Sequence, residues 1–143
     1  MTSKQISIFL ENRPGALSEA CTVLKNAGVN LRALSLADTQ QFGILRLLVD
    51  DPAAGKAALN AANFVVKENK VLAISVPDYA GGLAELFAII DRLELSVEYM
   101  YAFASGKKDR AVIVFRFTDQ EAAVSKLQSE NVAVITADMM AAE

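Results

Sequence analysis

Apolar and polar residues alternate in two short segments, one near the start of each half of the chain. Residues 5–10 place Ile6, Ile8 and Leu10 on one face, and residues 71–76 repeat the pattern with Leu72, Ile74 and Val76. Strict alternation is typical of a strand with one buried face. The two segments lie 66 positions apart, and each precedes a turn that contains an Asn or Asp and a Gly. The chain is therefore predicted to contain two copies of one unit.

Each alternating segment is followed by an amphipathic helix pattern. The spacing i, i+3, i+4, i+7 selects two matching sets, again 66 positions apart: Leu17, Ala20, Cys21 and Leu24, then Leu83, Leu86, Phe87 and Ile90. Gly28 follows the first helix, where glycine readily adopts a left-handed cap. This phase predicts that Cys21 is a small buried hydrophobic residue rather than a redox group.

The remainder of each copy predicts a hairpin, a second helix and a last strand. Hairpin strands are expected at 29–37 and 42–49, then at 96–104 and 110–117. Asp51 and Asp119 can cap short helices that run to about Ala62 and Ser129, and final strands follow at 64–68 and 132–136. The predicted fold class is α+β: two ferredoxin-like βαββαβ units with antiparallel sheets, helices on one sheet face, and the units packed together.

We expect the first domain to span residues 1–70 and the second 71–143, with only Lys67–Lys70 between their patterns. In the third strand of each copy, one alternating set should face the helices: Leu45, Leu47 and Val49, then Ile113, Phe115 and Phe117. The opposite set is too apolar for water alone: Ile44, Arg46 and Leu48, then Val112, Val114 and Arg116. A second sheet layer or a partner subunit should cover it, so we expect a homo-oligomer, a dimer. Arg46 and Arg116 would pair with carboxylates across an interface or extend toward solvent.

The composition of the chain argues against several classes of function. A net charge of −3, from 14 basic and 17 acidic residues without a long run of either, argues against a nucleic-acid partner. No apolar stretch approaches the roughly 20 residues that cross a bilayer, so we expect no membrane partner and a cytoplasmic protein. The chain has no histidine, which excludes Ser-His-Asp triads and His-containing zinc sites. We expect no catalytic residue, metal or cofactor.

The first turn carries the candidate chemistry. A strand that ends at Leu10 and a helix that opens near Gly15 leave the N–H groups of Gly15, Ala16 and Leu17 without intrahelical partners. Such donors attract an anion, and the helix dipole adds roughly 0.3–1 kcal/mol. Asn12 can accept from an ammonium while donating to a carboxylate, the pairing that a zwitterionic amino acid needs. The alternative is a plain strand-to-helix turn with an N-cap.

The motif Asn12-Arg13-Pro14-Gly15-Ala16-Leu17, followed after one helix by Ala27-Gly28-Val29-Asn30-Leu31, resembles the signature of the ACT domain, a regulatory module of amino-acid-controlled enzymes. The resemblance covers the whole chain as two copies, like stand-alone tandem ACT proteins. It implies an amino-acid site at the junction of two domains, formed by Leu10, Asn12, Gly15, Ala16, Leu17 and Asn30. The second copy departs from the motif, with Ala80 for Pro14 and Ser96 for Asn30. Its candidate residues are Asp78, Gly81, Gly82, Leu83 and Ser96.

Three hypotheses follow from the residues and the resemblance. The first is a non-catalytic sensor with a free amino acid as effector, which couples binding to assembly or to a partner enzyme. The second is a regulatory or scaffolding subunit of an amino-acid biosynthetic enzyme, with a vestigial pocket. The third is an acylphosphatase-like enzyme, but the sequence shows no paired general acid and base for it. Nothing in the sequence identifies the amino acid.

Overall fold

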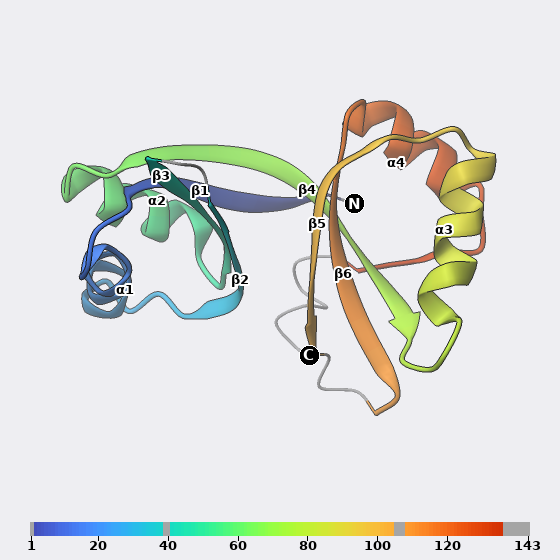
Figure 1. The fold of residues 1–143 in the computed structure, drawn as a ribbon, viewed down its shortest axis with the longest axis horizontal. Coiled ribbons are helices and arrows are strands. Elements are labelled where there is room, and N and C mark those ends of the chain that lie inside the picture. The colour runs from blue at the N-terminus through green and yellow to red at the C-terminus, as the bar shows by residue number, and fades with distance from the viewer. Residues whose placement is uncertain (1, 39–40, 105–107, 136–143) are drawn as a thin grey trace. The chain divides into compact units, whose positions relative to one another are not determined.

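The structure is a computed structural model, and it describes residues 2–38, 41–104 and 108–135 (Figure 1). By compactness the chain divides into a unit of Lys4–Asn69 and a unit of Met1–Ser3 with Lys70–Glu143. We call these the first and the second unit. Among the described residues, no helix has the length and apolar character needed to span a bilayer.

The first unit has the predicted order of elements. These are β1 (Ser3–Glu11), α1 (Ala16–Asn26), β2 (Leu31–Asp38), β3 (Phe42–Val49), α2 (Pro52–Ala61) and the first part of β4 (Val65–Pro77). Its strands are ordered β2-β3-β1-β4, and β3 pairs antiparallel with both β1 and β2. Asp51 caps α2, because its carboxylate accepts from the Ala54 N–H at 3.1 Å.

The second unit repeats this arrangement. It contains the rest of β4, then α3 (Gly82–Arg92), β5 (Val97–Ala104), β6 (Arg110–Phe117), α4 (Gln120–Gln128) and β7 (Ala133–Ile135). Its strands are ordered β7-β4-β6-β5. Asp119 caps α4 through the Ala122 N–H at 3.1 Å. The predicted α+β fold with two βαββαβ repeats is confirmed, although residue 136 of the predicted last strand lies outside the described residues.

One prediction about the strands is wrong. Residues 64–68 and 71–76 were expected to form two strands with a connection at Lys67–Lys70, whereas Val65–Pro77 forms the single strand β4. The connecting residues include no Gly or Pro that would bend the chain, and their long polar side chains suit exposed strand positions. The backbone therefore stays extended from one unit into the next.

Each unit has its own core between helices and sheet. The predicted helix-facing residues of β3 and β6 are confirmed: Leu45, Leu47 and Val49 pack in the first core, and Ile113, Phe115 and Phe117 in the second. On the opposite faces Leu48, Val112 and Val114 are also buried. Arg116 donates to the Lys70 carbonyl at 2.8 Å and lies 3.9 Å from the Glu98 carboxylate, so its pairing is within the second unit.

The predicted buried phase of the helices is partly wrong. Cys21 is exposed, and Leu17 and Leu83 are 43% and 36% exposed. The buried residues of each helix instead follow one line with a spacing of four: Ala16, Ala20 and Leu24, then Gly82, Leu86 and Ile90. The pattern i, i+3, i+4, i+7 straddles two neighbouring lines of the helix surface, and the sheet covers only one of them.

Gly82 lies where there is no room for a side chain. A Cβ on Gly82 would overlap the carbonyl oxygen of Pro77 and lie 3.1 Å from the Tyr79 ring. We expect Gly82→Ala to lower the free energy of unfolding by about 1–3 kcal/mol, the range for overpacking. Urea unfolding followed by circular dichroism measures this change. Ala84→Ser, at an exposed position of α3, is the control, and its free energy of unfolding should stay within about 0.5 kcal/mol of that of the parent chain. Equal free energies of unfolding for the parent chain and both variants would show that Gly82 is not crowded.

Candidate functional site

The turns before α1 and α3 have the same backbone geometry. Gly15 adopts φ 89° and ψ −13°, and Gly81 adopts φ 93° and ψ −11°. Both lie in the left-handed region that glycine enters without a Cβ penalty. The carbonyl of each glycine accepts a hydrogen bond from the N–H group four residues later. The Glu19 N–H donates to the Gly15 carbonyl at 2.9 Å, and the Glu85 N–H donates to the Gly81 carbonyl at 3.0 Å. Glycine therefore sets the direction in which each helix leaves its strand.

The predicted free N–H groups are only partly free. The Ala16 N–H points at the Arg13 carbonyl at 3.4 Å, and the Gly82 N–H donates to the Tyr79 carbonyl at 3.1 Å. The N–H groups of Gly15 and Leu17 donate to no other described residue. Of the three predicted donors, those of Gly15 and Leu17 are thus available to an anion at the start of α1.

Asn12 has partners within the protein at this turn. Its side-chain Nδ2 donates to Asp38 Oδ1 at 3.0 Å, and its backbone N–H donates to the Gln41 carbonyl at 3.3 Å. One of the two donors of the amide is therefore used by a carboxylate of the protein. Asp38 lies 26 residues away, at the end of β2, and only the sheet register brings it to this turn. Its negative charge makes this side of the turn suitable for an ammonium.

Arg13 is a feature of the turn that the sequence analysis missed. Its Nη1 and Nη2 donate to the two carboxylate oxygens of Glu19 at 3.1 and 2.8 Å, and its Nε lies 3.5 Å from Glu11. The hydrogen bond and charge of Arg13 lower the pKa of the Glu19 carboxyl, and Glu19 raises the pKa of Arg13. An exposed pair adds little stability. It does hold a guanidinium over the first turn of α1, about 4.0 Å from the place of a Cβ on Gly15.

The second copy replaces this ion pair with a weaker contact. Tyr79 stands where Arg13 stands, and its hydroxyl donates to Glu85, the counterpart of Glu19, at 3.4 Å. Asp78 is exposed, and its backbone N–H donates to the Asp109 carbonyl at 2.7 Å. Gly82 is buried and crowded, as described above. The second turn is therefore closed more tightly than the first.

In the first unit the predicted site residues form two groups, one at each end of α1. Leu10, Asn12, Gly15, Ala16 and Leu17 lie at the start of α1, with Leu10 and Ala16 buried. Asn30 lies beyond its other end, where its N–H donates to Asp50 at 3.0 Å and it lines a surface pocket of about 330 Å³ with Cys21 and Gly28. At about 1.5 Å per residue, the 11 residues of α1 separate the two groups by about 16 Å.

The second unit shows the same separation. Asp78, Gly81, Gly82 and Leu83 lie at the start of α3, whereas Ser96 lies beyond its end and lines a pocket of about 280 Å³ with Asp119 and Lys126. An amino acid is too short to touch both ends of an 11-residue helix. Within one unit, the predicted residues cannot all contact the same ligand.

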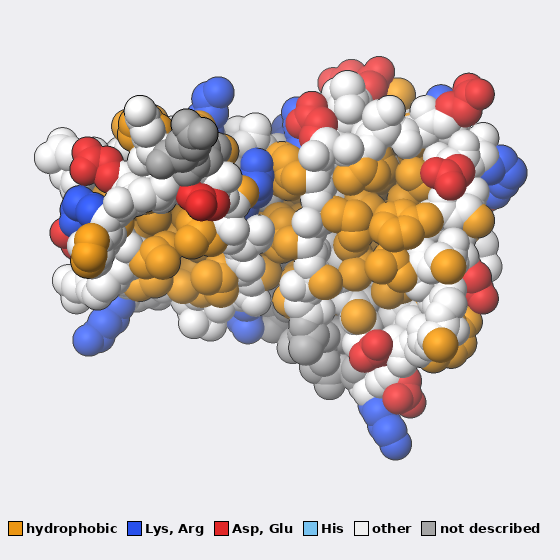
Figure 2. All heavy atoms as spheres, viewed as in Figure 1, with side chains coloured by type: hydrophobic (Ala, Val, Ile, Leu, Met, Phe, Trp, Pro, Cys, Tyr) orange, Lys and Arg blue, Asp and Glu red, His pale blue; other side chains and the backbone are white. Residues whose placement is uncertain are grey.

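An exposed apolar face lies beside α1 in the first unit and beside α3 in the second, and it was not predicted from the sequence. Leu34 and Leu36 pair with Leu47 and Leu45, so they share the helix-facing side of the sheet, yet they are 56% and 52% exposed. Figure 2 shows hydrophobic side chains gathered between α1 and β2, and again between α3 and β5. We call these the edge faces. They consist of Leu17, Cys21, Leu34 and Leu36 in the first unit, and of Leu83, Phe87, Met100 and Ala102 in the second.

The Arg13–Glu19 pair predicts an altered titration in Arg13→Met. We expect the pKa of Glu19 to rise toward its ordinary value, because Arg13 lowers it in the parent chain. Since the folded pKa is lowered, the stabilisation by Glu19 exists above its unfolded pKa and disappears as the pH falls through the folded pKa. Carboxyl NMR titration measures the pKa. Glu130, whose pKa is lowered by Arg92, is the control and should be unchanged; an unchanged Glu19 pKa would refute the assignment.

Comparison with known proteins agrees with this geometry. The sequence family described as the ACT domain pair matches residues 1–142. A solved structure from Bacteroides thetaiotaomicron is 35% identical, with a TM-score of 0.91, and the match covers 98% of this chain and 96% of that one. The regulatory subunits of aspartate kinase from Thermus thermophilus and Thermus flavus are 14% and 13% identical. Their TM-scores are 0.60 and 0.61, and each match covers 87% of this chain and 90% of theirs.

At such low identity the two Thermus structures show a likeness of fold alone. No curated protein matches the chain. The match to the family nevertheless spans nearly the whole sequence, and both units have the βαββαβ order and the glycine turn. The chain belongs to the ACT domain family, as a pair of ACT domains.

Proposed function

We propose that this protein is a non-catalytic regulatory protein that binds a free amino acid at the turn of residues 12–17. The observation that carries the proposal is the left-handed Gly15, which leaves the N–H groups of Gly15 and Leu17 without partners among the described residues. The membership in a regulatory family supports the same reading. We take residues 1–70 and 71–143 as the two ACT domains, which the division into compact units supports.

The groups around the turn suit the two charges of an amino acid. The carboxylate would accept from the N–H groups of Gly15 and Leu17, at the positive end of the α1 dipole, with Arg13 close by. The ammonium would lie toward Asp38, whose carboxylate is held by the Asn12 amide. In this arrangement Asn12 holds Asp38 in position, and the Asp38 carboxylate contacts the ammonium of the ligand.

The separation of Gly15 and Asn30 requires a second ACT unit to complete the site. We propose that a second copy of the chain supplies it, and that the edge faces form the contact. Seven of the eight residues of these faces are exposed in the single chain, and Phe87 is half-buried. Strands β2 and β5 each pair with only one other strand among the described residues. Both units present matching apolar residues at the same positions of the repeat, as a self-complementary contact requires. Pairing of such faces would join the start of one first helix to the end of another.

A site completed by two units couples binding to assembly. A ligand held by both units binds the associated state more tightly than the separated one, and it therefore shifts the equilibrium toward association. A partner enzyme that recognises one of the two states would then respond to the amino acid. The alternative, a scaffolding subunit with a vestigial pocket, predicts association without any response to an amino acid.

A thermal-shift screen over the twenty amino acids tests the proposed binding. We expect one or a few to raise the midpoint of unfolding, because they bind only the folded state. Gly15→Ala should abolish the shift, since a Cβ disturbs the left-handed turn and narrows the anion site. Asn63→Ala is the matched control, because it also places alanine at a positive φ, 69°, in the same unit but outside the turn. Leu17→Asp should repel the ligand carboxylate while leaving the helix intact.

A shift that survives both Gly15→Ala and Leu17→Asp would place the binding site elsewhere. No shift with any amino acid, together with co-purification of a biosynthetic enzyme, would favour the scaffolding alternative.

Sedimentation velocity tests the contact through the edge faces. We expect Leu36→Arg to weaken self-association by at least about tenfold, because it buries a charge in an apolar contact. Val65→Arg is the matched control, since Val65 is 63% exposed at the start of β4 and lies outside the edge faces. Equal dimer constants for Leu36→Arg and the parent chain would rule out this contact.

A further inference from the structure

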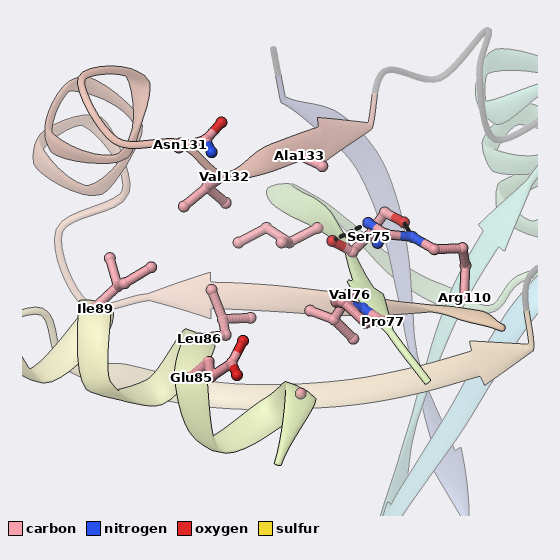
Figure 3. A pocket seen from close by; sticks show the side chains of 12 residues that line it. Ser75, Val76, Pro77, Glu85, Leu86, Ile89, Arg110, Asn131, Val132 and Ala133 are labelled. Carbon is pink, nitrogen blue, oxygen red and sulfur yellow. Dashed lines mark hydrogen bonds between the residues drawn. The ribbon is translucent and has the colours of Figure 1, made fainter. Parts of the chain in front are cut away.

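The second unit contains an open groove on the side of α3 that is opposite the edge face. Its volume is about 370 Å³, at the lower end of the range for small-molecule sites. Figure 3 shows side chains around one space from α3, from β4, from residues 131–133 at the start of β7, and from Arg110 at the start of β6. The apolar lining includes Val76, Leu86, Ile89 and Val132. None of the residues expected to contact the ligand at the Gly15 turn takes part in it.

The groove exists because β7 is too short to cover β4. Strand β7 pairs with Ala73–Ser75 only, whereas β6 pairs with β4 as far as Pro77. Beyond Ser75, the edge of β4 on the β7 side therefore has no paired strand among the described residues. The space left between this edge and α3 is the groove.

Arg110 reaches the open edge of the groove from the sheet face opposite α3, because it pairs with Pro77 rather than with the core residue Val76, and it brings a positive charge there. Its Nε donates to Ser75 Oγ at 2.9 Å, and its Nη2 donates to the Ser75 carbonyl at 3.0 Å. Both partners are neutral, and no carboxylate of the described residues forms an ion pair with Arg110. The guanidinium is thus held in place by two hydrogen bonds while its charge is not neutralised. Such a group binds a carboxylate readily.

Glu85 brings a negative charge to the same groove from α3. Positions 85 and 89 are one helical turn apart, on the flank of α3 that faces β7, whereas positions 83 and 87 belong to the edge face. The only hydrogen bond of the Glu85 side chain to a described residue is the 3.4 Å contact from the Tyr79 hydroxyl. Glu85 and Arg110 line one groove without forming an ion pair with each other.

The first unit lacks this combination. Glu19, the counterpart of Glu85, is bound by Arg13 through two hydrogen bonds. At the positions that correspond to Arg110 and Val132, the first unit has Phe42 and Phe64, and Phe64 packs against the core. The charges of the groove therefore belong to the second copy and are not a consequence of the repeat.

We propose that this groove is a second binding site, separate from the Gly15 turn, for an amino acid with an aliphatic side chain. At the open edge of β4 beyond Ser75, the ligand carboxylate pairs with Arg110 and the ammonium pairs with Glu85 on the α3 side, while the aliphatic group packs against Leu86, Ile89 and Val132. Two opposite charges beside apolar side chains, in a groove of this size, match a small zwitterion with an apolar body.

Methyl NMR of the full-length chain, titrated with leucine, tests the proposal. We expect saturable shifts of the Leu86 and Val132 methyl signals. Isocaproate, which lacks the ammonium, and isoamylamine, which lacks the carboxylate, should each bind at least about tenfold more weakly, as the loss of one charged hydrogen bond predicts. Equal affinity for the three compounds, or no shift of these methyl signals, would overturn the proposal.

Variants locate the site and separate it from the Gly15 turn. Arg110→Met should weaken leucine binding at these methyl groups at least about tenfold, and Arg110→Lys should restore part of it. Val132→Trp fills the groove without touching either charge and should abolish binding in a folded chain. Gly15→Ala should leave the shifts of Leu86 and Val132 unchanged. Leucine binding that disappears in Gly15→Ala but persists in Val132→Trp would refute the groove and support the turn alone.

Discussion

The geometry of each unit depends on one left-handed glycine between the first strand and the first helix. With φ near 90°, Gly15 and Gly81 turn the chain so that its next residues enter the helix at once, without a side-chain cap. Because no side chain fills the start of the helix, its N–H groups stay near the surface. The glycine therefore sets both the packing of the helix on the sheet and the exposure of the groups that a small anion can reach.

The two copies use this shared backbone differently. In the first copy, Arg13 and Asp38 place a positive and a negative group beside the open turn. In the second copy, Tyr79 and the buried Gly82 close the turn, and the charges lie farther along, at Glu85 and Arg110. Duplication kept the fold, whereas the polar residues around it diverged.

The sequence predicted the fold better than the site. Alternation, glycine turns and Asp caps each involve residues close together along the chain, so β3, β6 and the core-facing residues of these two strands could be predicted from local pattern. The contact of Asn12 with Asp38 depends on the register of the sheet, which no local pattern reports. The prediction that Cys21 is buried was wrong, because periodicity indicates the apolar side of a helix but not how much of that side the sheet covers. The Arg13–Glu19 pair lay within the motif and could have been proposed from the charges alone.

The uninterrupted strand β4 contributes side chains to the cores of both units. Val66 packs against the first core, and Leu72, Ile74 and Val76 pack in the second, so all four occupy even positions of one extended segment. A residue inserted between Val66 and Leu72 would reverse the face on which each later core residue lies relative to Val66. The connecting residues also form contacts, because the Asn69 side chain accepts from the Ser7 hydroxyl at 3.3 Å and the Lys70 carbonyl accepts from Arg116 at 2.8 Å. Both the number and the chemistry of these residues are therefore constrained.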